Sequence, residues 1–230
     1  MDEEKLGPRA LSRIRTEERI EALAFSHLDT GGVEAVNLRA VARDLGVSPS
    51  ALYRYIPDRD GLLTTLIAAS YTQLADVVEA ELGAQSGDAG VHDRIRTLAA
   101  AMRCWALEYP QRWALVYGSP VANFHAPAEA TTAAGTRVLV ILGELLRDAS
   151  PAAAAGRRSD TFAEDLAAIG RAEAQGLAPD AVELGLELWV KLVGLISAEV
   201  FGYFGDETLR EPEEFFRRAV DRALGDIVTS

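Results

Sequence analysis

The sequence of 230 residues has few of the side chains from which disulfide bonds and metal sites are built. Its one cysteine, Cys104, excludes a disulfide or a cysteine-based metal site within one chain, and we expect an inert buried thiol there. The three histidines lie far apart in the sequence and show no ligand spacing. We therefore predict no metal site and no cofactor.

Long apolar runs are also missing. The longest uncharged stretch, residues 114–128, contains Gly118 and two prolines, so no membrane-spanning segment is predicted. The first 15 residues change from acidic to basic without an apolar core, which is not the pattern of a signal peptide. We expect a soluble, cytoplasmic protein.

Lysine is nearly absent, with two residues against 21 arginines, and the net charge of the chain is −12. An acidic chain is repelled by phosphate, which argues against a protein that coats nucleic acid or an anionic membrane. The charge is unevenly distributed, however. Residues 1–60 hold 9 basic and 11 acidic residues, a net charge of −2, whereas residues 61–230 hold 14 and 24, a net charge of −10. The N-terminal quarter can therefore present a locally basic surface.

Helix-forming residues are abundant, with 39 alanines among them. Apolar residues recur at helical spacing, and no strand pattern or internal repeat is found, so we predict an all-α fold. A long connecting helix, residues 59–82, follows the N-terminal region 1–58. A larger region, residues 83–230, comes after it and begins with the loop at residues 83–90. The predicted helices span residues 12–29, 38–45, 49–56, 59–82, 91–108, 110–117, 125–148, 159–175, 179–204 and 211–228.

The sharpest local pattern lies at residues 38–55, LRAVARDLGVSPSALYRY. Asn37 is suited to cap a first short helix, and Gly46 is suited to end it. Ser48 is suited to cap a second helix that has Pro49 at its first position. Two short helices joined by a three- to four-residue turn with glycine predict a helix-turn-helix, whose second helix lies in the major groove of DNA.

The outward positions of the second helix fit DNA contact because none of them is acidic. We predict that the second helix and its C-terminal end contact DNA through Ser48, Ser50, Tyr53, Arg54 and Tyr55. Arg39 and Arg59 are predicted to contact phosphates. The alternative is a helical hairpin in an unrelated core, which would not need an acid-free outer face.

Residues 12–66 resemble the DNA-binding domain of TetR-type transcriptional regulators, from the Gly-Gly after the first helix through the motif to IPDRDGLL. Two later segments, YPQRWALVYGSPVANFHAP and LWVKLVGLISAEVFGYFG, resemble the C-terminal domain of the WHG-type subgroup. The pattern that names this subgroup occurs here as Trp189 followed by Val193-Gly194, so its histidine is replaced. The resemblance implies a three-helix DNA-binding domain and a larger helical domain for effector binding and dimerisation.

The resemblance also implies an effector held between the helices that follow the DNA-binding domain, although large rings are more often simply core. The predicted pocket residues are Met102, Trp105, Tyr109, Trp113, Tyr117, Phe124, Phe162 and Trp189. Small residues at Gly194, Ala198 and Gly202 repeat every four positions and would let another helix approach closely. With Phe216, Val220 and Leu224 of the last amphipathic helix, they form the predicted dimer interface.

The leading hypothesis is a homodimeric regulator, most simply a repressor, that binds a palindromic operator and is released by a small, largely apolar effector. A helical small-molecule binding protein without a DNA-binding role is an alternative. An all-α enzyme is a further alternative, although no nucleophile, metal or phosphate-binding motif occurs in a supporting context.

Overall fold

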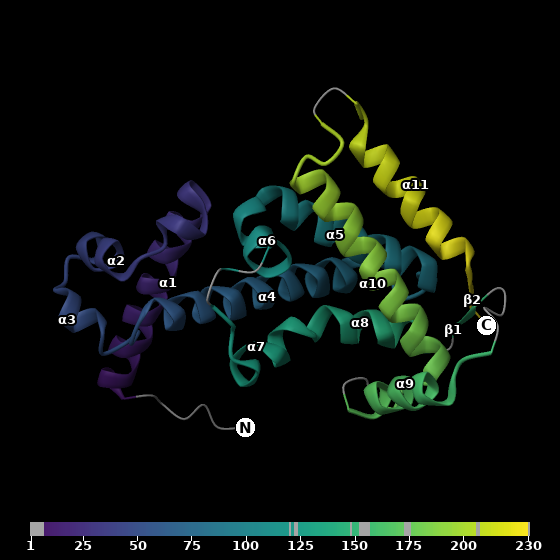
Figure 1. Ribbon diagram of the computed structural model, residues 1–230, viewed down its shortest axis with the longest axis horizontal. Coiled ribbons are helices and arrows are strands. Elements are labelled where there is room, and N and C mark those ends of the chain that lie inside the picture. The colour runs from purple at the N-terminus through teal and green to yellow at the C-terminus, as the bar shows by residue number, and fades with distance from the viewer. Residues whose placement is uncertain are drawn as a thin grey trace. The chain divides into compact units, whose positions relative to one another are not determined.

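Figure 1 shows the computed structural model, which describes residues 7–119, 121, 124–147, 149–151, 157–172, 176–205 and 208–229. Nearly all regular structure in these residues is helical, which confirms the all-α prediction. The helices are α1 (Pro8–Ala35), α2 (Leu38–Leu45), α3 (Pro49–Leu52), α4 (Arg59–Ala84), α5 (Val91–Glu108), α6 (Pro110–Tyr117), α7 (Ala128–Gly135), α8 (Arg137–Leu145), α9 (Asp160–Ala172), α10 (Pro179–Val200) and α11 (Pro212–Gly225). Two short strands, β1 (Ala149–Pro151) and β2 (Ile227–Thr229), complete the described structure.

The contacts divide the chain into two compact units, which we describe separately. Unit 1 contains the described residues up to Ser70 and the described part of 109–131, and unit 2 contains residues 71–108 and those from Thr132 onward. Helix α4 contributes residues to both units. The sequence predicts one region from 83 to 230, whereas the contacts group 109–131, with α6, among the N-terminal helices.

Helix α1 forms much of the core of unit 1. Its buried face includes Ile20, Ala24 and Leu28, all at most 1% exposed, in keeping with the apolar spacing of the sequence. The backbone leaves helical geometry at Gly32, where φ is +67°, and this is close to the predicted end of the helix. A glycine suits this position because the left-handed region is costly for residues with a Cβ.

The caps predicted for the helix-turn-helix are present. The side chain of Asn37 accepts a hydrogen bond from the backbone N–H of Ala40 at 2.9 Å, which caps α2. Gly46 ends α2 in the left-handed conformation, with φ of 76°. The side chain of Ser48 accepts a hydrogen bond from the backbone N–H of Ala51, and α3 begins at the proline that follows Ser48.

Asp58 caps the start of helix α4, since its side chain accepts a hydrogen bond from the N–H of Gly61 at 2.8 Å. Among the described residues it is long and apolar enough to span a membrane by length and composition, with a mean hydropathy of 1.2 in its most apolar window. Most of its large apolar side chains are buried by protein, however, although Val77 is exposed. Asp76 and Glu79 pair with Arg137 of α8. We therefore assign α4 as a core helix.

Helix α10 is central to unit 2, where it contacts α5, α8, α9 and α11. Its buried face includes Leu188, Leu192 and Ile196. Strands β1 and β2 pair in antiparallel register, with Ala149 opposite Thr229. The sequence predicts no strand, because three-residue strands far apart in the chain leave no alternating pattern.

Several predicted boundaries in unit 2 are wrong. The helix predicted at 125–148 is two helices, α7 and α8, separated at Thr136. Helix α10 ends at Val200 and is followed by Gly202 with φ of +67°, so the predicted helix 179–204 is too long. The end of the helix predicted at 159–175 lies outside the described residues. The thiol of Cys104 is exposed, which contradicts the predicted buried position.

Candidate nucleic-acid interface

Most of the seven residues predicted to contact DNA are exposed and lie on or next to α2 and α3. Five of them are exposed, and we call this set the recognition surface: Arg39, Ser48, Ser50, Tyr53 and Arg54. The ring of Tyr53 is 48% exposed although it is large and apolar, and Tyr55 is half-buried. Among the ion pairs of the described residues, none involves Arg39 or Arg54. Both guanidinium groups are therefore available for an anionic partner.

The second helix of the motif is shorter than predicted. Helix α3 has four residues and is followed by a turn in which the N–H groups of Tyr55 and Ile56 both donate to the carbonyl of Leu52. The hydroxyls of Ser48 and Ser50 lie 3.0 Å apart and form a hydrogen bond. The buried side chain of Leu52 holds this segment on the core of unit 1. The exposed side chains thus extend from a short, well-anchored element.

The negative charge of one acidic group near the recognition surface is offset by hydrogen bonds from its neighbours. The carboxylate of Asp44, at the end of α2, lies 2.8 Å from His27 Nε2 of α1 and accepts a hydrogen bond from Arg43 Nε at 3.0 Å. The bond from Arg43, followed by the contact with His27, lowers the pKa of Asp44. Repulsion of phosphate by this carboxylate is therefore reduced, and α2 is tied to α1.

Arg59 has a different role from the predicted phosphate contact. Its guanidinium is half-buried and donates to the carbonyl of Val33 at 3.0 Å and to the carbonyl of Val36 at 3.3 Å. The last carbonyls of a helix lack partners within the helix and carry partial negative charge, so they attract a cation. Arg59 thus joins the start of α4 to the end of α1. The predicted phosphate contact is therefore corrected: Arg59 positions α4 against α1.

The contact that joins α6 to α1 could not be predicted from the sequence. Arg112 donates two hydrogen bonds to the carboxylate of Asp29, at 3.0 and 2.6 Å. Its guanidinium also lies 4.1 Å from the ring centroids of Phe25 and Tyr109, within range of cation–π attraction. The side chain of Arg112 is only 13% exposed. This cluster explains why α6 belongs to unit 1, and a partner 83 residues away leaves no signal in the local sequence.

The structure does not bring the predicted effector residues together in one unit. Four lie in unit 1, where Trp113 is fully buried and contacts Tyr117 in a tilted arrangement, with the ring centroids 4.3 Å apart. The others lie in unit 2, where Phe162 is 42% exposed. The unit 1 residues are Tyr109, Trp113, Tyr117 and Phe124, and the unit 2 residues are Met102, Trp105, Phe162 and Trp189. Met102 and Trp105 are at most 2% exposed, as core side chains are.

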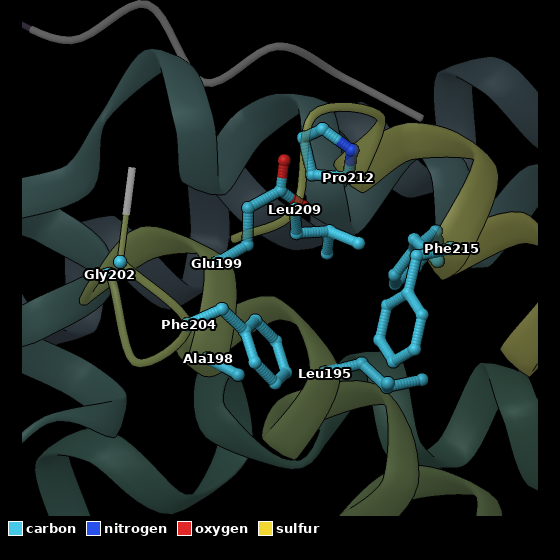
Figure 2. Close-up of a pocket in the computed structure, with 10 residues that line it drawn as sticks. Leu195, Ala198, Glu199, Gly202, Phe204, Leu209, Pro212 and Phe215 are labelled. Atoms are coloured by element: carbon cyan, nitrogen blue, oxygen red, sulfur yellow. The ribbon is translucent and has the colours of Figure 1, made fainter. Parts of the chain in front are cut away.

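Unit 2 contains a half-open cavity of about 260 Å³ between the end of α10 and the start of α11. Figure 2 shows the rings of Phe204 and Phe215 turned toward the same space as Leu195. None of the eight predicted effector residues is among its lining residues. The lining residues are Leu195, Ala198, Glu199, Gly202, Phe204, Gly205, Leu209, Pro212, Phe215 and Phe216.

The predicted dimer interface also needs correction. Phe216, Val220 and Leu224 are at most 6% exposed and already belong to the core of unit 2, so they offer little surface to a second chain. Gly202 lies beyond the end of α10 and lines the cavity with Ala198, so it does not extend a helical row of small residues. Gly194 is exposed on α10 and has open space around it.

Comparison with known proteins gives a consistent result. The family model "Bacterial regulatory proteins, tetR family" matches residues 22–66, and the model "Tetracyclin repressor-like, C-terminal domain" matches residues 95–223. HTH-type transcriptional regulators of Mycobacterium tuberculosis and Mycobacterium bovis are each 35% identical over 227 residues, covering 92% of both proteins.

Solved structures agree with these matches. The crystal structure of SCO4313, described as a regulatory protein, is 30% identical with a TM-score of 0.75, and the match covers 95% of this chain and all of that one. A tetR family transcription regulator from Shewanella sp. PV-4 has a TM-score of 0.57 at 19% identity, over 90% of this chain and 94% of that one. The second match supports the fold alone.

Proposed function

Because this chain belongs to the TetR family and is a DNA-binding transcriptional regulator, we propose that it acts as a homodimeric repressor whose palindromic operator is released when a small, largely apolar effector binds. The observation that supports operator contact is the recognition surface, which is exposed, acid-free and includes two arginines without ion pairs among the described residues. The family consists of regulators, so the enzyme alternative loses its basis. We also propose a cytoplasmic location, as expected for a transcriptional regulator of this family.

Operator contact is tested with the DNA upstream of the gene in a mobility-shift titration. We expect Arg54→Ala and Tyr53→Ala each to weaken binding by about 1–3 kcal/mol per half-site, because each removes one contact to bases or phosphates. Arg171→Ala, on the exposed face of α9, and Tyr203→Ala, which is 71% exposed in unit 2, are matched controls. Wild-type affinity in both recognition-surface variants would exclude this assignment.

Salt dependence provides a second readout of the same surface. Binding to phosphates releases counterions, so the logarithm of the affinity should fall linearly with the logarithm of the salt concentration. We expect Arg39→Ala to reduce this slope by about 1 for each phosphate contact that is lost. A helical binding protein without a DNA-binding role would show no such affinity.

Dimerisation is proposed through the outer face of α10. Glu187, Val190, Lys191 and Gly194 share one exposed face of this helix, and Val190 is 69% exposed. A two-fold dimer is expected because one short recognition element contacts few base pairs. Gly194→Arg should convert the dimer to a monomer in sedimentation velocity and weaken operator binding. Gly83→Arg, at another helical glycine with open space around it, should leave the dimer intact.

A further inference from the structure

The cavity at the end of α10 has a size suited to a small organic molecule. Its volume is about 260 Å³, and all ten of its lining residues lie in unit 2. An engineered apolar cavity of about 150 Å³ is known to hold benzene, so this volume corresponds to about ten non-hydrogen atoms. Its lining residues come from the last turns of α10, from the segment that follows it and from the first turn of α11.

Aromatic and aliphatic groups form most of the cavity wall. The rings of Phe204 and Phe215 meet edge to face, with their centroids 5.6 Å apart. Phe204 is 41% exposed and Phe216 is buried, so the wall extends from the surface into the core. Leu195 and Leu209 add aliphatic surface. This wall favours the ring or hydrocarbon body of a ligand.

Glu199 is the ionised side chain among the lining residues. Its carboxylate accepts two hydrogen bonds of 2.7 Å from Arg103 of α5, and both side chains are largely buried. Arg103 also lies over the ring of Phe216, 5.7 Å from its centroid, and is not a lining residue itself. Glu199 is therefore the member of the pair that lines the cavity.

The pair leaves acceptor capacity on the carboxylate. An ionised carboxylate offers about four lone-pair sites, and Arg103 occupies two of them. The faces of the neighbouring phenylalanine rings are also electron-rich and attract cations. Every polar feature of the lining side chains thus favours a hydrogen-bond donor with positive charge. An anion would find no cationic side chain among the lining residues.

We propose that this cavity binds a small lipophilic amine, in which an aromatic or alicyclic body contacts the phenylalanines and one protonated nitrogen donates to Glu199. The site is separate from the recognition surface, and the proposal does not depend on operator binding. Its chemistry also differs from that of a purely apolar effector, because a charged head group adds affinity.

The test uses three probes that share a phenyl ring and a two-carbon body but differ in charge: 2-phenylethylamine, 2-phenylethanol and phenylacetate. Isothermal titration of the full chain should show binding of the amine about tenfold tighter than that of the alcohol, because a charge-assisted hydrogen bond is stronger than a neutral one. Phenylacetate should not bind detectably. Equal binding of the amine and the anion, or no binding of the amine at millimolar concentration, would overturn the proposal.

Two variants locate the binding in this cavity. Ala198→Phe should block the amine and the alcohol alike by filling the space, whereas Ala168→Phe, at an exposed position of α9, should bind like the wild type. The double variant Arg103→Gln/Glu199→Gln removes both charges without leaving an unpaired ion. It should bring the amine down to the affinity of the alcohol and leave the alcohol unchanged.

Folding and oligomeric state are checked in the same samples by circular dichroism and sedimentation. Unchanged amine binding in the folded double variant would overturn the role of Glu199, even if Ala198→Phe does not fold. Operator release by the amine is a separate measurement. If the amine binds but does not release the operator, regulation through this site is excluded, while the assignment of the binding site is unaffected.

Discussion

The helix-turn-helix segment and the last two helices are stabilised by interactions of different range. In the first, Asn37, Ser48 and Asp58 each accept a hydrogen bond from a backbone N–H three residues further along. In the second, Arg103 pairs with Glu199 across 96 residues. A change to a local cap should cost little and act on one helix, whereas a change to a long-range contact should affect a whole unit.

The largest effect is expected in the core of unit 2. Leu192→Ala removes a fully buried side chain of α10 and should lower the free energy of unfolding by about 2–5 kcal/mol, through lost burial and the cavity left behind. Urea denaturation measures this change. Leu107→Ala is the control, because Leu107 is 41% exposed and should cost far less. Equal losses would mean that α10 is not central to unit 2.

The contact between α6 and α1 should rank next. Arg112→Ala removes two charge-assisted hydrogen bonds and leaves the Asp29 carboxylate, which is partly exposed, so we expect a loss of about 1–3 kcal/mol. Arg112→Lys should recover only part of this, because an ammonium cannot reproduce the two parallel hydrogen bonds or the stacking on rings. Full recovery in the lysine variant would show that charge alone holds the contact.

A local cap should have a smaller effect. Asn37→Ala removes the acceptor for the Ala40 N–H and should cost about 1 kcal/mol of stability. Asn37→Asp keeps the acceptor oxygen and should remain close to the wild type. Thermal unfolding of the three proteins under one set of conditions makes the comparison, and a loss as large as that of Leu192→Ala would contradict the local character of this motif.

The smallest effect concerns pH. Arg43 and His27 lie against Asp44 and lower its pKa in the folded protein. The stability from this contact is therefore present above the unfolded pKa of about 3.9 and is lost as the pH falls through the lower folded value. Asp44→Asn should flatten the dependence of the urea midpoint on acidic pH. A slope identical to that of the wild type would show that other carboxylates dominate there.

Much of the N-terminal region could be predicted because its determinants are close in sequence. The caps of α2 and α3, the glycine that ends α2 and the acid-free outer face are all read from neighbouring residues. The role of Arg59 could not be predicted in this way. An exposed arginine and one that caps another helix have the same local sequence, and only the approach of the end of α1 distinguishes them.

The larger helical region was predicted less completely. Helix positions were mostly found, but the interruption at Thr136, the pairing of β1 with β2 and the cavity beside Glu199 were not. Each of these depends on which segments meet, and apolar periodicity specifies a buried face without naming its partner. For the same reason, Phe216 and Val220 could not be assigned to the core of the subunit or to a dimer interface.

By itself, the sequence determined the helical class, the helix-turn-helix and a nearly neutral N-terminal quarter in an acidic chain. These properties follow from propensities, caps and charges that act within a few residues. The tertiary structure decided that α6 joins unit 1 through Arg112 and Asp29, and that a carboxylate borders an aromatic cavity in unit 2. Such pairings require helices distant in sequence to approach within hydrogen-bond distance, which local preferences do not specify.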